Sequence, residues 1–158
     1  MSSTLQNLSS QQLKKTIDFS VNKIAVVVAE WNTEITSALY EGVVETLLAQ
    51  GVKLENIIYK SVPGTFELSL GAQWLAKEAD IDAVIALGCV IQGDTPHFDY
   101  ICQSVSYGIT EVGLKYNKPV IFGVLTTLTL QQALDRAGGE HGNKGIEAAM
   151  TALNMLAF

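Results

Sequence analysis

The sequence is poor in charged residues and contains a single arginine. Charged side chains make up 16% of its 158 residues, below the roughly 25% of an average soluble domain. The net charge is −6, and the ten basic residues form no stripe of the kind that follows a phosphate backbone. The shortage of arginine argues against nucleic acid as a partner, and the low charge predicts extra buried surface in subunit contacts.

Long apolar runs, a leader segment and paired cysteines are also missing. No apolar stretch approaches the roughly 20 residues of a membrane-spanning helix. Residues 1–20 lack the apolar core of a secretory signal and the arginines of a transit peptide, so we expect a cytoplasmic protein without a membrane partner. Cys89 and Cys102 have neither C-x-x-C spacing nor a histidine partner, which predicts buried thiols and no metal site.

Short apolar runs alternate with helical patterns along the chain. The runs at 23–29, 57–62, 83–91 and 120–125 are typical of strands buried on both faces. Helices are expected from Asn32 or Thr33 to before Gly51, over 65–78 and 98–116, from Thr129 through Ala137, and from Asn143 onward.

This β-α-β-α-β-α-β-α-α order predicts an α/β protein. Its crossovers require a four-stranded parallel sheet with helices on both faces, a three-layer α/β/α sandwich of the flavodoxin-like kind. Residues 1–20 are expected to form an N-terminal arm, and residues 21–158 a single domain.

The stretch Gly88–Tyr100 joins the end of an apolar run to a helical pattern. Gly93-Asp94-Thr95 offers free backbone N–H groups, a hydroxyl and the positive end of a helix dipole, which suit a phosphate or carboxylate. Alternatively, Thr95 only caps the helix. His97 could move protons, because imidazoles exchange them near neutral pH, or could be a solvated side chain.

Further candidates follow the other apolar runs. Trp31 offers a flat face to a heterocycle, or simply packs. In the turn 63–67, Phe66 and Glu67 could hold a ring or polyol, while the carboxylate could instead serve only the helix dipole. The guanidinium of Arg136 either binds an anion through two N–H groups or is an ordinary surface charge. Because the carboxyl ends of parallel strands meet at one edge of a sheet, the loops carrying Trp31 and His97 should converge.

The sequence has no serine elbow, nucleotide phosphate loop, dinucleotide glycine triplet or metal-binding carboxylate cluster. Hydrolase, kinase and dehydrogenase functions therefore lack their essential parts. The residues by themselves indicate a site for an anion and a planar polar ring, with the capacity to move protons.

A set of motifs occurs in the order Trp31-Asn32, VPGTFEL at Val62–Leu68, GCVIQGDTPHFDY at Gly88–Tyr100, PVIFGVLTT at Pro119–Thr127, QQALDRAG at Gln131–Gly138 and GNKG at Gly142–Gly145. With these motifs the chain resembles the 6,7-dimethyl-8-ribityllumazine synthase family of riboflavin biosynthesis from Lys23 to Leu156. The resemblance implies a transferase without metal or organic cofactor. It would condense 5-amino-6-(D-ribitylamino)uracil with 3,4-dihydroxy-2-butanone 4-phosphate and release phosphate and water.

The resemblance also implies a site and an assembly. The implied binding residues are Trp31, Asn32, Thr65, Phe66, Glu67, Cys89, Val90, Ile91, Asp94 and Thr95, with His97 as the proton shuttle. Phe122, Arg136 and Lys144 would reach the pocket from an adjacent subunit. The family forms pentamers, pentamer pairs or sixty-subunit shells, so a homo-oligomer is expected. A flavin- or lumazine-binding shell without catalysis, or a flavodoxin-like binding module, is the alternative function.

Overall fold

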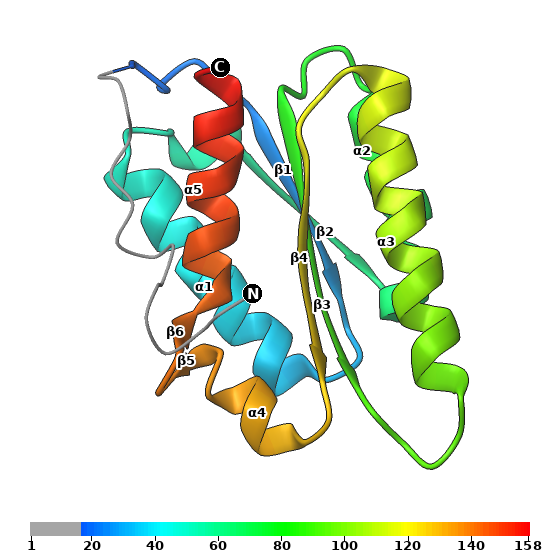
Figure 1. Cartoon of the computed structure of the whole chain (residues 1–158). Helices are drawn as coiled ribbons and strands as arrows, with labels where there is room; N and C mark the ends of the chain where they lie inside the picture. The colour runs from blue at the N-terminus through cyan, green and yellow to red at the C-terminus, as the bar shows by residue number, and fades with distance from the viewer. Residues whose placement is uncertain (1–16) are drawn as a thin grey trace.

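A parallel sheet of four strands forms the centre of the molecule (Figure 1). The computed structural model describes residues 17–158, and within them the sheet order is β2-β1-β3-β4, with every neighbouring pair parallel. The strands are β1 (Ile24–Ala29), β2 (Ile57–Val62), β3 (Ala83–Ile91) and β4 (Val120–Thr127). The predicted fold class and all four predicted strands are confirmed, and β4 continues two residues beyond its predicted end.

The two central strands are buried because their side chains are apolar on both faces. All six residues of β1 are buried. Its alternate residues enter two separate cores: Val26 and Val28 belong to one, and Ala25 and Val27 to the other. This alternation is the period of two expected for a strand, and burial on both faces is typical of a parallel sheet.

Helices cover both faces of the sheet. Helices α1 (Thr33–Ala49) and α5 (Lys144–Leu156) pack on one face, and α2 (Leu68–Lys77) and α3 (His97–Tyr116) on the other, as Figure 1 shows. Short 3-10 turns, η2 (Leu54–Asn56) and η3 (Thr65–Glu67), precede β2 and α2. The predicted helix over 65–78 therefore begins as a 3-10 turn.

The crossing of α1 and α5 depends on small residues and on one asparagine. Asn143 caps α5, as predicted, by accepting a hydrogen bond from the Gly145 N–H at 2.7 Å. Its amide also donates to the carbonyl of Ala38 in α1 at 2.7 Å. A Cβ atom on Gly145 would collide with the backbone carbonyl of Leu39. The first turn of α5 is thus fixed against the middle of α1.

The prediction of a helix through Ala137 is wrong. Helix α4 spans only Leu130–Leu134. Ala137 lies in β5 (Ala137–Gly139), which pairs antiparallel with β6 (Gly142–Asn143). The predicted cap at Thr129 is present, since its hydroxyl accepts from the Gln132 N–H at 3.2 Å. The hairpin takes the chain out of the helix before the glycines that were expected to end it.

One described residue before β1, Phe19, belongs to the core. Phe19 is 1% exposed and packs in the same core as α1 and α5. The carbonyl of Ser20 accepts a hydrogen bond from the Asn56 amide at 3.0 Å. Residues 1–16 of the expected arm lie outside the described residues. Between residues 17 and 158, no helix is both long and apolar enough to cross a membrane.

Candidate functional site

A pocket of about 580 Å³ opens where β1, β2 and β3 end. In the order β2-β1-β3-β4 the connections change direction between β1 and β3, and ligands of open α/β sheets bind at such a switch point. The loops after β1, β2 and β3 gather at this end of the sheet (Figure 1). The pocket is lined by Trp31, Asn32, Gly64, Thr65, Phe66, Glu67, Cys89, Val90, Ile91, His97 and Ile101.

Two aromatic side chains line this pocket and are largely exposed to solvent. Trp31 is 72% exposed and Phe66 is 54% exposed. The backbone beneath Trp31 is nonetheless fixed, because the Trp31 N–H donates to the Pro63 carbonyl at 3.2 Å and the Glu30 N–H donates to the Val62 carbonyl at 2.9 Å. Exposure rules out core packing as the role of Trp31. An aromatic face on a rigid loop suits a planar ligand.

Glu67 is the carboxylate of the pocket. It ends the 3-10 turn η3, and its N–H donates to the Gly64 carbonyl at 3.3 Å. A Cβ atom on Gly64 would lie 3.1 Å from the Glu67 carboxylate, so the glycine leaves room for this side chain. Within residues 17–158 the carboxylate has no hydrogen-bond partner, and its oxygens can accept from a ligand.

His97 is the first residue of α3 and lines the pocket. The ring has no hydrogen-bond partner among the described residues, so both ring nitrogens can exchange protons with a ligand. The loop before it is exposed, and Asp94 and Thr95 do not line the pocket. The hydroxyl of Thr95 accepts from the His97 N–H at 3.5 Å, too long for a firm helix cap.

The two cysteines differ from the expectation in one respect. Cys89 is buried, as predicted, whereas Cys102 is only partly buried, and neither forms a disulfide. Burial raises the pKa of the Cys89 thiol to about 11. Because the thiolate is the reactive form, Cys89 contributes to the pocket wall at neutral pH without acting as a nucleophile.

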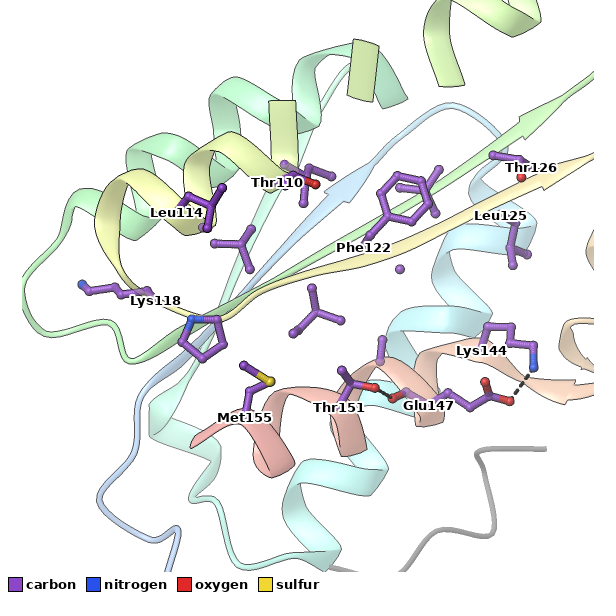
Figure 2. Close-up of a pocket in the computed structure, with 18 of the residues that line it drawn as sticks. Thr110, Leu114, Lys118, Phe122, Leu125, Thr126, Lys144, Glu147, Thr151 and Met155 are labelled. Carbon is purple, nitrogen blue, oxygen red and sulfur yellow. Dashed lines mark hydrogen bonds and ion pairs between the residues drawn. The ribbon is translucent and has the colours of Figure 1, made fainter. Parts of the chain in front are cut away.

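A second hollow, of about 1090 Å³, runs along the edge strand β4 between α3 and α5. Figure 2 shows Phe122 over β4, with Lys144 and Glu147 on α5 facing it. Phe122 is 41% exposed. Arg136 also lines this hollow, and its guanidinium donates to the Gln132 carbonyl at 2.9 Å. Lys144 pairs with the carboxylate of Glu147.

The predicted site residues therefore fall into three groups, of which one, Asp94 and Thr95, lines neither cavity. The pocket contains every predicted binding residue between Trp31 and Ile91, together with His97. Phe122, Arg136 and Lys144 line the hollow beside β4 instead. Among the described residues that line the pocket, none is a lysine or arginine. An anion held there therefore meets no cationic side chain among the described residues of the lining.

Sequence reasoning missed two wall residues, Gly64 and Ile101. Ile101 follows His97 by four positions on α3 and so shares its helix face, a signal that the spacing contained. It also missed the pairing of Lys144 with Glu147, whose spacing of three on one helix was likewise visible in the sequence. For residues 17–158, no group of three or more potential metal ligands lies together.

The sheet order and the crevice at its switch point define a flavodoxin-like α/β protein with a small-molecule site. The sequence profile of 6,7-dimethyl-8-ribityllumazine synthase matches residues 22–158. The chain belongs to the 6,7-dimethyl-8-ribityllumazine synthase family.

Individual relatives agree with the profile over nearly the whole chain. A 6,7-dimethyl-8-ribityllumazine synthase from Cytophaga hutchinsonii is 65% identical over 157 residues, which are 99% of this chain and 98% of the relative. Proteins of the same name from Parabacteroides distasonis and Flavobacterium psychrophilum are 56% and 44% identical, over 100% and 98% of this chain and 99% and 82% of the relatives.

Proposed function

We propose that this chain is a 6,7-dimethyl-8-ribityllumazine synthase. It condenses 5-amino-6-(D-ribitylamino)uracil with 3,4-dihydroxy-2-butanone 4-phosphate, the penultimate step of riboflavin biosynthesis. An amine of the pyrimidine attacks the ketone and an imine forms with loss of water. Phosphate then leaves, and the second amine closes the ring with loss of another water. The observation that carries the proposal is the grouping of Trp31, Glu67 and His97 in one pocket of a chain from this family.

The pyrimidine binds at the aromatic end of this pocket. Trp31 stacks on the ring, which its exposed face on a rigid loop permits. Thr65, Phe66 and Glu67 hold the ring and the ribityl chain, for which Glu67 has free carboxylate oxygens. The backbone of residues 89–91 forms the opposite wall. These contacts fix the two amines relative to the ketone, and such positioning lowers the barrier to condensation.

The phosphate binds beside the start of α3. Asp94 and Thr95 present backbone N–H groups there, and the positive end of the helix dipole favours an anion. The pocket wall itself contains no lysine or arginine among the described residues. The missing positive charge comes from Arg136 and Lys144 of an adjacent subunit, and Phe122 of that subunit closes the ring site.

His97 moves protons between the amines, the ketone oxygen and the leaving groups. Its imidazole is unpartnered in residues 17–158 and lines the same pocket as Trp31 and Glu67. A general acid and base at this place is worth about 10²- to 10⁴-fold in rate.

The assembly follows from the split site. We propose a homo-oligomer built from pentamers, possible sizes being one pentamer, two pentamers or a sixty-subunit shell, acting on its small-molecule substrates in the cytoplasm. The proposed N-terminal arm covers residues 1–20 and the single α/β domain residues 21–158, and Phe19 of the arm packs in the core of that domain.

An assay with both substrates tests the proposal through the absorbance of the lumazine product. We expect product well above the uncatalysed background, a lower kcat for His97→Ala, and mainly a higher KM for the phosphate substrate in Arg136→Ala. Absence of turnover together with tight riboflavin binding would instead identify a flavin-binding shell. A fully active monomer, measured by light scattering beside the assay, would contradict the shared site.

A further inference from the structure

One carbonyl at the pocket lies where β3 continues past its neighbour β1. The pairing of β1 with β3 ends at Val28 and Leu87, whereas β3 stays paired with β4 as far as Ile91. Near the start of β3 the Val84 N–H donates to the Pro119 carbonyl at 2.9 Å. Just after the end of β3 the Gln92 N–H donates to the Thr127 carbonyl at 2.8 Å, so both bonds point to the β4 side. Backbone groups of a strand alternate in direction, so the carbonyl of Cys89 faces the β1 side.

The side chain of Asn32 supplies the partner that β1 no longer provides. Its amide nitrogen donates to the Cys89 carbonyl at 3.0 Å. The backbone of Asn32 has φ 62° and ψ 47°, a left-handed conformation that asparagine tolerates better than most residues. Its own carbonyl accepts from the Ile35 N–H at 2.9 Å and begins α1. Asn32 thus starts the helix with its backbone and reaches β3 with its side chain.

Thr65 approaches the same carbonyl from the end of β2. Its buried hydroxyl donates to Cys89 at 3.4 Å, a longer and weaker bond than that of Asn32. Gly88 makes this approach possible, because a Cβ atom there would lie 2.9 Å from the Thr65 hydroxyl oxygen. Asn32, after β1, and Thr65, after β2, therefore both donate to one carbonyl of β3, that of Cys89.

We propose that Asn32 is a positioning residue that sets the width of the ring site through the Cys89 carbonyl. Trp31 precedes Asn32, and the wall residues Val90 and Ile91 follow Cys89, so the hydrogen bond ties the stacking loop to the facing wall. The inference rests on the proposed function only in naming the occupant as a pyrimidine or lumazine ring. The donor of Asn32 acts on the protein rather than directly on the substrate.

Two substitutions remove the donor while keeping the backbone conformation accessible. Asn32→Gly adopts positive φ without strain, and Asn32→Asp keeps the shape but turns an acceptor toward the carbonyl. We expect Asn32→Gly to raise the KM for the pyrimidine about tenfold, as the loss of one partly buried hydrogen bond predicts. Asn32→Asp should raise it further. The KM for the phosphate substrate should change less than about twofold, because no phosphate contact is involved.

Asn56 provides a matched control at the amino ends of the strands, opposite the pocket. Its amide donates to the Ser20 carbonyl at 3.0 Å, the same kind of bond over the same distance. Asn56→Gly should lower the melting temperature as Asn32→Gly does, without changing either KM. If Asn32→Gly also lowered only the melting temperature, its role would be structural and the proposal would be overturned.

A binding measurement separates this proposal from the proposed function. Trp74→Phe leaves Trp31 as the fluorescent indole of the described chain, and 6,7-dimethyl-8-ribityllumazine is titrated while its quenching of Trp31 is followed. We expect Asn32→Gly to weaken the Kd about tenfold. An inactive parent protein that still bound lumazine would overturn the proposed function, and the ratio of Kd values would still decide the positioning role. Unchanged Kd and KM values in both Asn32 variants would overturn the positioning role alone.

Discussion

The pocket at the ends of β1 to β3 and the hollow beside β4 carry different kinds of side chain. The pocket has the exposed aromatic faces, a free carboxylate and the imidazole. The hollow has Arg136, Lys144 and a half-exposed Phe122 (Figure 2). Neither set alone offers groups for both a planar ring and a phosphate. This division is what the proposed site, shared between two subunits, requires.

The largest expected effect comes from placing the two halves on different subunits. His97→Ala and Arg136→Ala should each be slow as homo-oligomers, the former by about 10²-fold or more in kcat. Co-expressed one to one, they should regain sites in which both residues are intact, about a quarter of all sites by random pairing in a ring. Activity is measured on the mixed oligomers, with separately assembled variants mixed afterwards as the control. If co-expression only averages the two variants, the halves do not combine across subunits.

A stability effect should follow from the contact between α1 and α5. Gly145→Ala drives a methyl group into the Leu39 carbonyl and should lower the free energy of unfolding by about 2 kcal/mol or more. Gly113→Ala on α3 is the control, because its Cβ would come no nearer than 3.4 Å to another group and alanine favours helix. Urea unfolding at a fixed protein concentration measures both. Equal losses in the two variants would contradict the tight α1–α5 contact.

A smaller effect is expected at the aromatic face of the pocket. Trp31→Ala should raise the KM for the pyrimidine about tenfold, since aromatic stacking contributes about 0.5–1.5 kcal/mol beyond burial. Trp31→Phe should change it much less, and neither variant should lose stability, because Trp31 is largely exposed. Trp74→Ala removes another exposed tryptophan outside both cavities and serves as the control. An unchanged KM in Trp31→Ala would show that the pyrimidine does not stack on Trp31.

The smallest effect concerns the thiols. Burial raises the pKa of Cys89 to about 11; burial, and then the charge of Asp99, also raise the pKa of the more exposed Cys102. A raised thiol pKa means that the fold favours the neutral form, and this stabilisation is lost as pH rises through that pKa. Alkylation followed by mass spectrometry should therefore modify Cys102 first near neutral pH. Cys89 should react only toward pH 11, and lumazine in the pocket should slow it. Faster labelling of Cys89 near neutral pH would contradict its burial.

Local signals were sufficient to predict the fold. Buried parallel strands are continuous apolar runs, and the run of β3 was predicted to its final residue. Loops at the carboxyl ends of such strands converge by geometry, which brought Trp31, Glu67 and His97 together as expected.

The predictions that went wrong depended on contacts outside a single helix or strand. Helix α4 ends early because Ala137 pairs with Asn143 in a hairpin, and no local propensity indicates that pairing. Asn32 occupies the predicted cap position, but its side chain bonds to Cys89, 57 residues away, rather than to the helix amides. Periodicity cannot report such a bond, because it describes neighbours along one element and not the partners of a side chain in space.

Both ends of the described chain lie far from the pocket. Phe19 and Ser20 pack at the amino ends of the strands, and α5 runs away from the pocket toward Phe158, near the same end of the molecule (Figure 1). A tag, fluorophore or second protein joined at Phe158 would therefore lie at the opposite end of the subunit from the pocket, beside the hollow that Phe158 lines. The fold thus offers an attachment point that leaves the mouth of the pocket unobstructed.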